Sequence, residues 1–210
     1  MINRTNFALF ALGAVLFSAL LYVAMTYHIL GWPADDDVDV TAPKLIARIA
    51  LYTIAFGLPY ALFQLTRKLN ALAILFAIIL VPAVHFGSIS LYMWWANVGQ
   101  DLAAADPGAG SANAALIGGL LAGFAGAAVS FALLFILRLN AKLNLIVLLA
   151  GLVLLTACGG LGLKLLSGLD APEPMDLVLK LFLPWQLIFG FFLAVLLKPS
   201  LKRGEAATTD

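Results

Sequence analysis

Long apolar segments alternate with short polar connections along the whole chain. A helix needs about 20 apolar residues to cross the hydrocarbon core of a bilayer. Six segments are long enough, and in chain order they are Phe7–Leu30, Leu45–Thr66, Ala71–Trp95, Ala112–Leu137, Leu143–Leu166 and Leu177–Leu197. The pattern predicts an all-α membrane protein: one six-helix bundle over residues 1–197, then a flexible basic tail over residues 198–210.

The connections carry residues that end helices or stay in water. Gly31-Trp32-Pro33 and an acidic run follow the first segment, and Asp106-Pro107-Gly108 lies in the longest connection, Ala96–Ser111. Glycine and proline clusters of this kind are typical of loops. The first segment also resembles a signal peptide, but its apolar stretch exceeds the usual ~7–15 residues and no small-x-small cleavage site follows. We expect an uncleaved span.

Composition supports a membrane location. Hydrophobic residues make up 63% of the 210 residues, charged residues 11%, and the mean hydropathy is +1.05. Soluble domains are about half apolar and about a quarter charged. The chain has one cysteine, Cys158, so a disulfide framework within the chain is excluded.

The basic residues predict an orientation, because cytoplasmic loops are enriched in Lys and Arg. Most of the 12 basic residues fall on one side if the N-terminus is inside: Arg4, Arg67, Lys68, Arg138, Lys142, Lys198, Lys202 and Arg203. The other side receives most of the 11 acidic residues: Asp35, Asp36, Asp37, Asp39, Asp101, Asp106, Asp170, Glu173 and Asp176. We therefore expect a multi-pass protein of the inner (plasma) membrane with both termini in the cytoplasm.

Small residues recur at four-residue spacing in the fourth segment, at Ala115, Gly119, Gly123 and Ala127. Such a face lets two helix backbones approach closely. The fifth segment is also rich in glycine, and we expect the two to pack together as a hairpin or against another subunit. Basic-Leu-Asn turns at 68–70 and 138–140 suggest either a transporter-like repeat or simply two tight cytoplasmic turns.

Few residues inside the predicted spans are suited to catalysis. The spans contain no Asp or Glu, and the chain has two histidines, His28 and His85. Metal, haem and proton-transfer sites in membranes depend on such groups. Ser88 lies three residues from His85, but no carboxylate lies at that depth to complete a triad. We expect no catalytic residues, no metal and no cofactor.

Three cations lie near the predicted outer ends of spans: Arg48, Lys164 and Lys180. With them we group polar residues at similar depth, namely Tyr52, His85, Ser88, Tyr92 and Gln186. One interpretation is an outward-facing pocket for an anionic or polar solute. The other is that the cations reach the interface and pair with the outer acids. The four tryptophans are interpreted mainly as an outer interfacial belt: Trp32, Trp94, Trp95 and Trp185. Trp185 lies deeper, and the alternative for it is a packing residue or a pocket wall.

Two functional hypotheses follow. The first is a non-enzymatic accessory or structural subunit of a membrane complex, with short loops and close-packing glycines. The second is a small transporter or channel that uses the cationic pocket. An intramembrane enzyme is disfavoured. The expected partners are the lipid bilayer and other membrane subunits or further copies of the chain, and no basic run favours nucleic acid.

Overall fold

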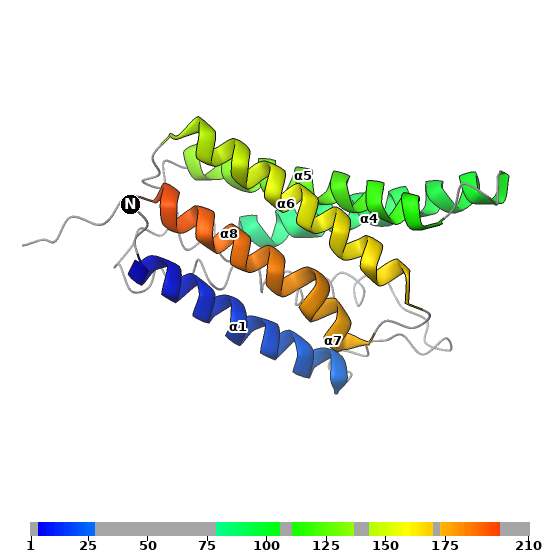
Figure 1. Ribbon diagram of the computed structural model, residues 1–210, viewed down its shortest axis with the longest axis horizontal. Helices are drawn as coiled ribbons and strands as arrows, with labels where there is room; N and C mark the ends of the chain where they lie inside the picture. The colour runs from blue at the N-terminus through cyan, green and yellow to red at the C-terminus, as the bar shows by residue number, and fades with distance from the viewer. Residues whose placement is uncertain (1–3, 28–78, 106–110, 137–142, 170–172, 198–210) are drawn as a thin grey trace, which may run out of the picture.

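The computed structural model describes residues 4–27, 79–105, 111–136, 143–169 and 173–197. The regular elements in these ranges are helices (Figure 1). They are α1 (Arg4–Thr26), α4 (Val81–Ala105), α5 (Ser111–Ile136), α6 (Leu145–Ser167), α7 (Pro174–Leu177), the π-helix η2 (Val178–Phe182) and α8 (Leu183–Leu196).

Four helical segments among the described residues are long and apolar enough to cross a membrane. They are Asn6–Val23, Asn113–Ile136, Leu145–Ser167 and Pro174–Leu196. The all-helical fold class is thus confirmed at this coarser level. The predicted span Leu45–Thr66, the first residues of the third span (71–78) and the tail (198–210) lie outside the described residues. The count of six and the orientation stay predictions.

The connection predicted at Ala96–Ser111 is partly helical. We predicted a loop from Ala96, whereas α4 continues without a break to Ala105. Residues 96–105 contain no proline and four alanines, which favour helix, so their polar side chains do not end it. The helix ends directly before Asp106-Pro107-Gly108. The Trp95 indole N–H donates to the Ala114 carbonyl at 3.0 Å and ties α4 to α5.

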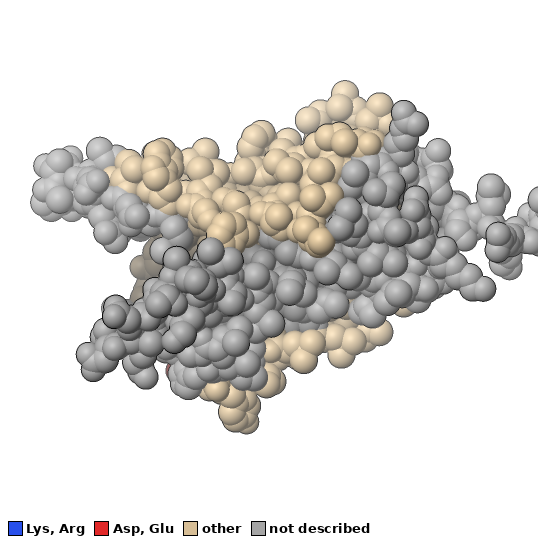
Figure 2. Space-filling view, turned by 180° about the vertical axis from the view of Figure 1, so that it is seen from behind, with Lys and Arg blue, Asp and Glu red and all other residues tan. Residues whose placement is uncertain are grey.

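The helices pack in the spatial order α4, α5, α6, α8 and α1. Figure 1 shows α1 and α8 side by side, with α6 and α5 above them and α4 behind. The main core lies where α8 meets α1, α5 and α6, and includes Phe10, Phe131, Leu155 and Phe189. Outward-facing positions are also apolar, and the described surface visible in Figure 2 is almost entirely free of Lys, Arg, Asp and Glu. Such a surface is compatible with lipid.

Glycines bring α5 and α6 into backbone contact. A Cβ added to Gly119 would lie 2.5 Å from the Gly159 carbonyl oxygen, and one added to Gly159 would lie 2.7 Å from that of Gly119. A Cβ on Gly123 would lie 2.9 Å from the Leu155 oxygen. The small-residue face predicted from the sequence therefore lies against α6, and its flanking members Ala115 and Ala127 are both buried.

The last membrane segment changes helix type along its length. Proline 184 has no N–H to donate to the carbonyl four residues earlier, that of Lys180. The chain forms a π-helix there, and the Leu183 N–H bonds to the Val178 carbonyl. Gly162 of α6 packs on this irregular turn, since a Cβ at position 162 would lie 2.7 Å from the Lys180 oxygen. The proline therefore coincides with a π-helical turn.

Candidate functional site

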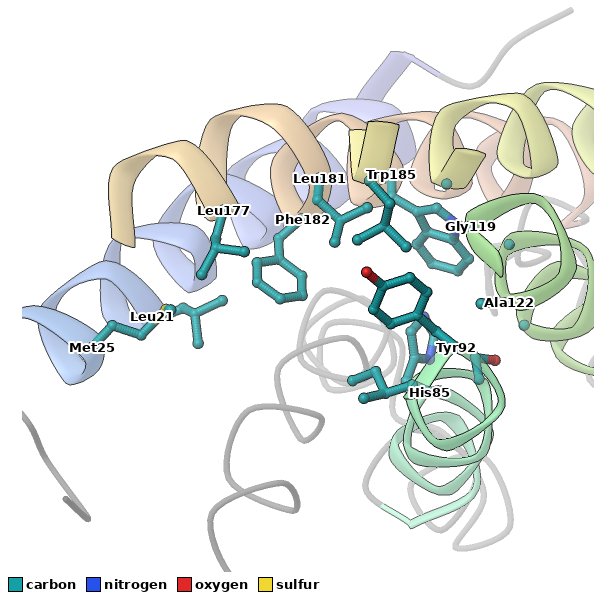
Figure 3. Close-up of a pocket in the computed structure, with 16 residues that line it drawn as sticks. Leu21, Met25, His85, Tyr92, Gly119, Ala122, Leu177, Leu181, Phe182 and Trp185 are labelled. Carbon is teal, nitrogen blue, oxygen red and sulfur yellow. The ribbon is translucent and has the colours of Figure 1, made fainter. Parts of the chain in front are cut away.

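A cavity of about 280 Å³ lies between the helices, and 16 residues that line it are drawn in Figure 3. They come from all five packed helical segments. The side towards α1 and η2 is apolar and is built from Leu21, Met25, Leu177, Leu181 and Phe182. On α5 and α6 the wall consists mainly of small residues, namely Gly119, Ala122, Gly123, Gly126 and Gly159. The glycines that bring α5 against α6 therefore also leave space on the cavity side.

The cavity lies towards one end of the bundle. Its α1 residues are in the last turns of that helix, and its α6 residues, Gly159 and Leu163, are in the second half of α6. The final segment contributes residues 177–185, from its start. In the predicted orientation this end is the outer half of the membrane.

Helix α4 presents three polar side chains to the cavity, His85, Ser88 and Tyr92. Their spacing of three and four residues places them on one helix face. The Ser88 hydroxyl donates to the Val84 carbonyl at 2.9 Å, so its hydrogen is used within its own helix. Gly126 makes room for it, because a Cβ there would lie 2.9 Å from the Ser88 Oγ.

Aromatic rings continue from the cavity into the core. The buried His85 ring stands edge-on to Trp185, with centroids 4.6 Å apart and planes at 88°. Trp185 in turn stacks on Phe189 at 5.1 Å. Edge-to-face and offset-stacked pairs are favourable ring geometries and hold such side chains in place. The Trp185 indole is thus both a packing residue and a cavity wall.

The two described lysines of the predicted cationic set, Lys164 and Lys180, do not line this cavity. Lys180 pairs with Asp176, with 2.7 Å between Nζ and Oδ1, and both side chains are about one-third exposed (32% and 31%). Lys164 is exposed, and neither lysine belongs to the described lining. Arg48 and Tyr52 lie outside the described residues. Of the six predicted ligand-binding residues, the structure brings His85 and Ser88 together, with Tyr92 beside them.

Gln186 is buried in the bundle, and its predicted role in ligand binding stays a prediction. Its side chain is 4% exposed and lies outside the described lining. Position 190 of α8 packs on Phe10, and Val178 packs with Leu21 and Met25, so Gln186 faces the middle of α1. Within the described chain, its amide nitrogen and oxygen have no hydrogen-bond partner.

Comparison with known protein families, curated proteins and solved structures finds no match. The site must therefore be interpreted from its own chemistry. Its described lining consists of apolar, aromatic and small side chains plus His85, Ser88 and Tyr92. A charged molecule would lose hydration there without a described ionic partner, whereas an uncharged one would not. The arrangement suits a lipid-soluble molecule with a small polar group.

Several lining residues were missed from the sequence. Leu21, Met25, Leu181 and Phe182 are indistinguishable by type from lipid-facing residues of the same spans. The glycines were identified, but as packing residues. A usable signal is the presence of small residues on one helix together with bulky aromatic residues, Tyr92 and Trp185, at the same depth on others.

Proposed function

We propose that this chain is a polytopic membrane protein that binds a neutral, lipid-soluble ligand, acting as a small transporter or as a ligand-carrying subunit of a membrane complex. It acts by binding rather than by catalysis. The observation that carries the proposal is the cavity of about 280 Å³ between α1, α4, α5, α6 and the last segment. It approaches the ~300–1,000 Å³ typical of small-molecule sites.

The wall chemistry supports an apolar occupant. An engineered apolar cavity of about 150 Å³ stays free of water and binds benzene. The present cavity has nearly twice that volume, and its wall contains many aliphatic and aromatic groups. A ligand in it would gain dispersion contacts with these walls. The polar side chains of α4 in the lining, His85, Ser88 and Tyr92, supply the groups that orient such a ligand.

The earlier hypotheses are affected differently. An accessory subunit is compatible with the cavity, and extraction in mild detergent tests it: a particle well above 22.3 kDa plus micelle supports it, and a lone monomer opposes it. The anion-binding alternative gains no support from Lys180, whose ammonium group is engaged by Asp176. Other subunits, or further copies of the chain, stay proposed partners.

We propose an inner (plasma) membrane location with both termini in the cytoplasm. Helices α5 and α6 offer a direct test, since Ser111 and Asn144 mark opposite ends of this hairpin. In a Cys158→Ala background, a membrane-impermeant maleimide added to intact cells should label Ser111→Cys and leave Asn144→Cys unlabelled. The reverse pattern would invert the topology.

Native mass spectrometry of the protein extracted in mild detergent tests ligand binding. We expect a lipid-soluble molecule to remain bound to the wild type. Ala122→Leu places three additional carbon atoms in the cavity wall and should abolish this binding. Ala132→Leu makes the same change at an exposed position of the same helix and should leave it intact. An unliganded wild type, or equal binding by both variants, would overturn the proposal.

A further inference from the structure

The Tyr92 hydroxyl is a hydrogen-bond donor at the cavity. No hydrogen bond of this hydroxyl is found within the described chain. The neighbouring Ser88 hydrogen is directed to the Val84 carbonyl, and His85 packs edge-on against Trp185. In Figure 3 the Tyr92 ring extends from α4 into the cavity, and its hydroxyl points towards the side formed by Phe182 and Trp185. A ligand there meets an O–H group that is available to donate.

Aromatic side chains surround this hydroxyl. Tyr92, Phe182 and Trp185 line the same part of the cavity and come from three different elements. Trp185 is held by rings on two sides, His85 at 4.6 Å and Phe189 at 5.1 Å. The indole is therefore fixed where it lines the cavity, and contacts between aromatic rings, edge-to-face or offset, are favourable there. This favours a planar ligand over a branched one.

The charges nearest in sequence to the lining do not favour an ion. Asp176 and Lys180 flank Leu177 and Leu181, yet they are paired with each other. Lys164 follows the lining residue Leu163, but it is exposed and lies outside the described lining. An ionic head group would enter the apolar wall without a counter-charge among the described lining residues, which is costly. A neutral acceptor needs just the one donor that Tyr92 provides.

We infer that the cavity takes a neutral, flat, lipid-soluble ring carrying a carbonyl group, a compound of the quinone type, with the carbonyl accepting a hydrogen bond from Tyr92. Trp185 and Phe182 contact the ring, and Leu21, Met25 and Leu177 contact its apolar substituents. This inference rests on the proposed function and specifies its ligand class.

Two probes that share one carbon skeleton test it. Duroquinone is a tetramethyl ring with two carbonyls, and durene is the same tetramethyl ring without them. The full chain is reconstituted in lipid nanodiscs, and each compound is measured by equilibrium dialysis as saturable binding above that of empty nanodiscs. One hydrogen bond contributes about a fivefold change in affinity. We expect duroquinone to bind wild type about fivefold more tightly than durene.

Variants assign this preference to one atom. Tyr92→Phe removes the hydroxyl alone and should bring the two affinities together by weakening duroquinone, with durene unchanged. Tyr22→Phe makes the same change at a tyrosine of α1 that packs near the cavity without belonging to its described lining, and it should keep the fivefold preference. Ala122→Leu should abolish saturable binding of both compounds.

The outcomes separate this inference from the proposed function. If both probes bind and are lost in Ala122→Leu, but Tyr92→Phe keeps the preference, the carbonyl assignment is overturned and ligand binding stands. If neither probe binds the wild type saturably, both are overturned. Methyl laurate carries a carbonyl on a straight chain, and binding as tight as that of duroquinone would overturn the requirement for a ring.

Discussion

Replacing Gly119 with alanine tests how closely α5 and α6 approach. The added methyl carbon would lie 2.5 Å from the Gly159 oxygen and 2.8 Å from the Gly160 Cα, both backbone atoms that no rotamer can move. Ordinary contact begins at 3.4 Å, so the helices must separate by about 0.9 Å at this point. Overpacking of this kind costs about 3 kcal/mol. Alanine has a higher helix propensity than glycine, which offsets about 1 kcal/mol of this cost, so the net loss of folding stability is about 2 kcal/mol.

Gly87→Ala is the matched control. Gly87 also lies within a helix, α4, and nothing is found within 4 Å of a Cβ built there. The same substitution should therefore keep the propensity gain of up to about 1 kcal/mol without the clash. The two variants should differ by about 3 kcal/mol although their chemical change is identical.

Cys158 provides the readout. It is the single cysteine of the chain, it is partly buried, and it precedes Gly159 on α6. Brief maleimide labelling across a titration with a denaturing detergent reports the fraction of molecules in which the thiol has become accessible. We expect the midpoint to fall in Gly119→Ala and to stay equal or rise in Gly87→Ala. Equal midpoints for Gly119→Ala and wild type would refute the backbone contact between α5 and α6.

Three further predictions concern the last membrane segment. Gly162→Ala should lower the free energy of unfolding by about 1–3 kcal/mol, because the added Cβ would lie 2.7 Å from the Lys180 carbonyl oxygen. Gly168→Ala is its control and should leave stability unchanged, because the nearest atom to its Cβ would be 3.8 Å away. Lys180→Met should change stability by less than about 1 kcal/mol, because its ion pair with Asp176 is partly exposed; a larger loss in the same labelling assay would indicate a stronger role. Gln186→Met should stabilise by about 1 kcal/mol, because it removes a buried amide without a described partner; a loss of stability would show that the amide is bonded.

Hydropathy alone located most of the described helices. The predicted span Ala112–Leu137 corresponds to α5, and Leu143–Leu166 to α6, each within two residues at both ends. These ends coincide with changes from apolar to polar residues, which hydropathy detects directly. The end of α4 was missed because residues 96–105 are polar enough to leave lipid and yet good helix formers. Polarity marks the edge of the membrane, while backbone propensity sets the end of the helix.

The site was less accessible to sequence reasoning. His85, Ser88 and Tyr92 share one face by spacing alone, and the pairing of Lys180 with an acid is consistent with Asp176 four residues earlier. The cavity itself depends on how far α4 stands from α5 and on the rotation of each helix about its axis. Both are set by contacts between different helices. Examples are the packing of Ser88 against Gly126 and the hydrogen bond from the Trp95 indole to the Ala114 carbonyl.

The π-helical turn before Pro184 also sets the phase between the two parts of the last segment. An α-helix turns by about 100° per residue. The wider turn at Val178–Phe182 accommodates what amounts to one extra residue, so Leu177 and Trp185 line the same cavity. A single-residue deletion within this turn would restore regular α-helical geometry with Leu177 and Trp185 seven residues apart, about two turns, so both would stay on the cavity face. Regular α-helical geometry with every residue kept would instead rotate everything before the turn by about 100°, and Leu177 would leave the cavity wall.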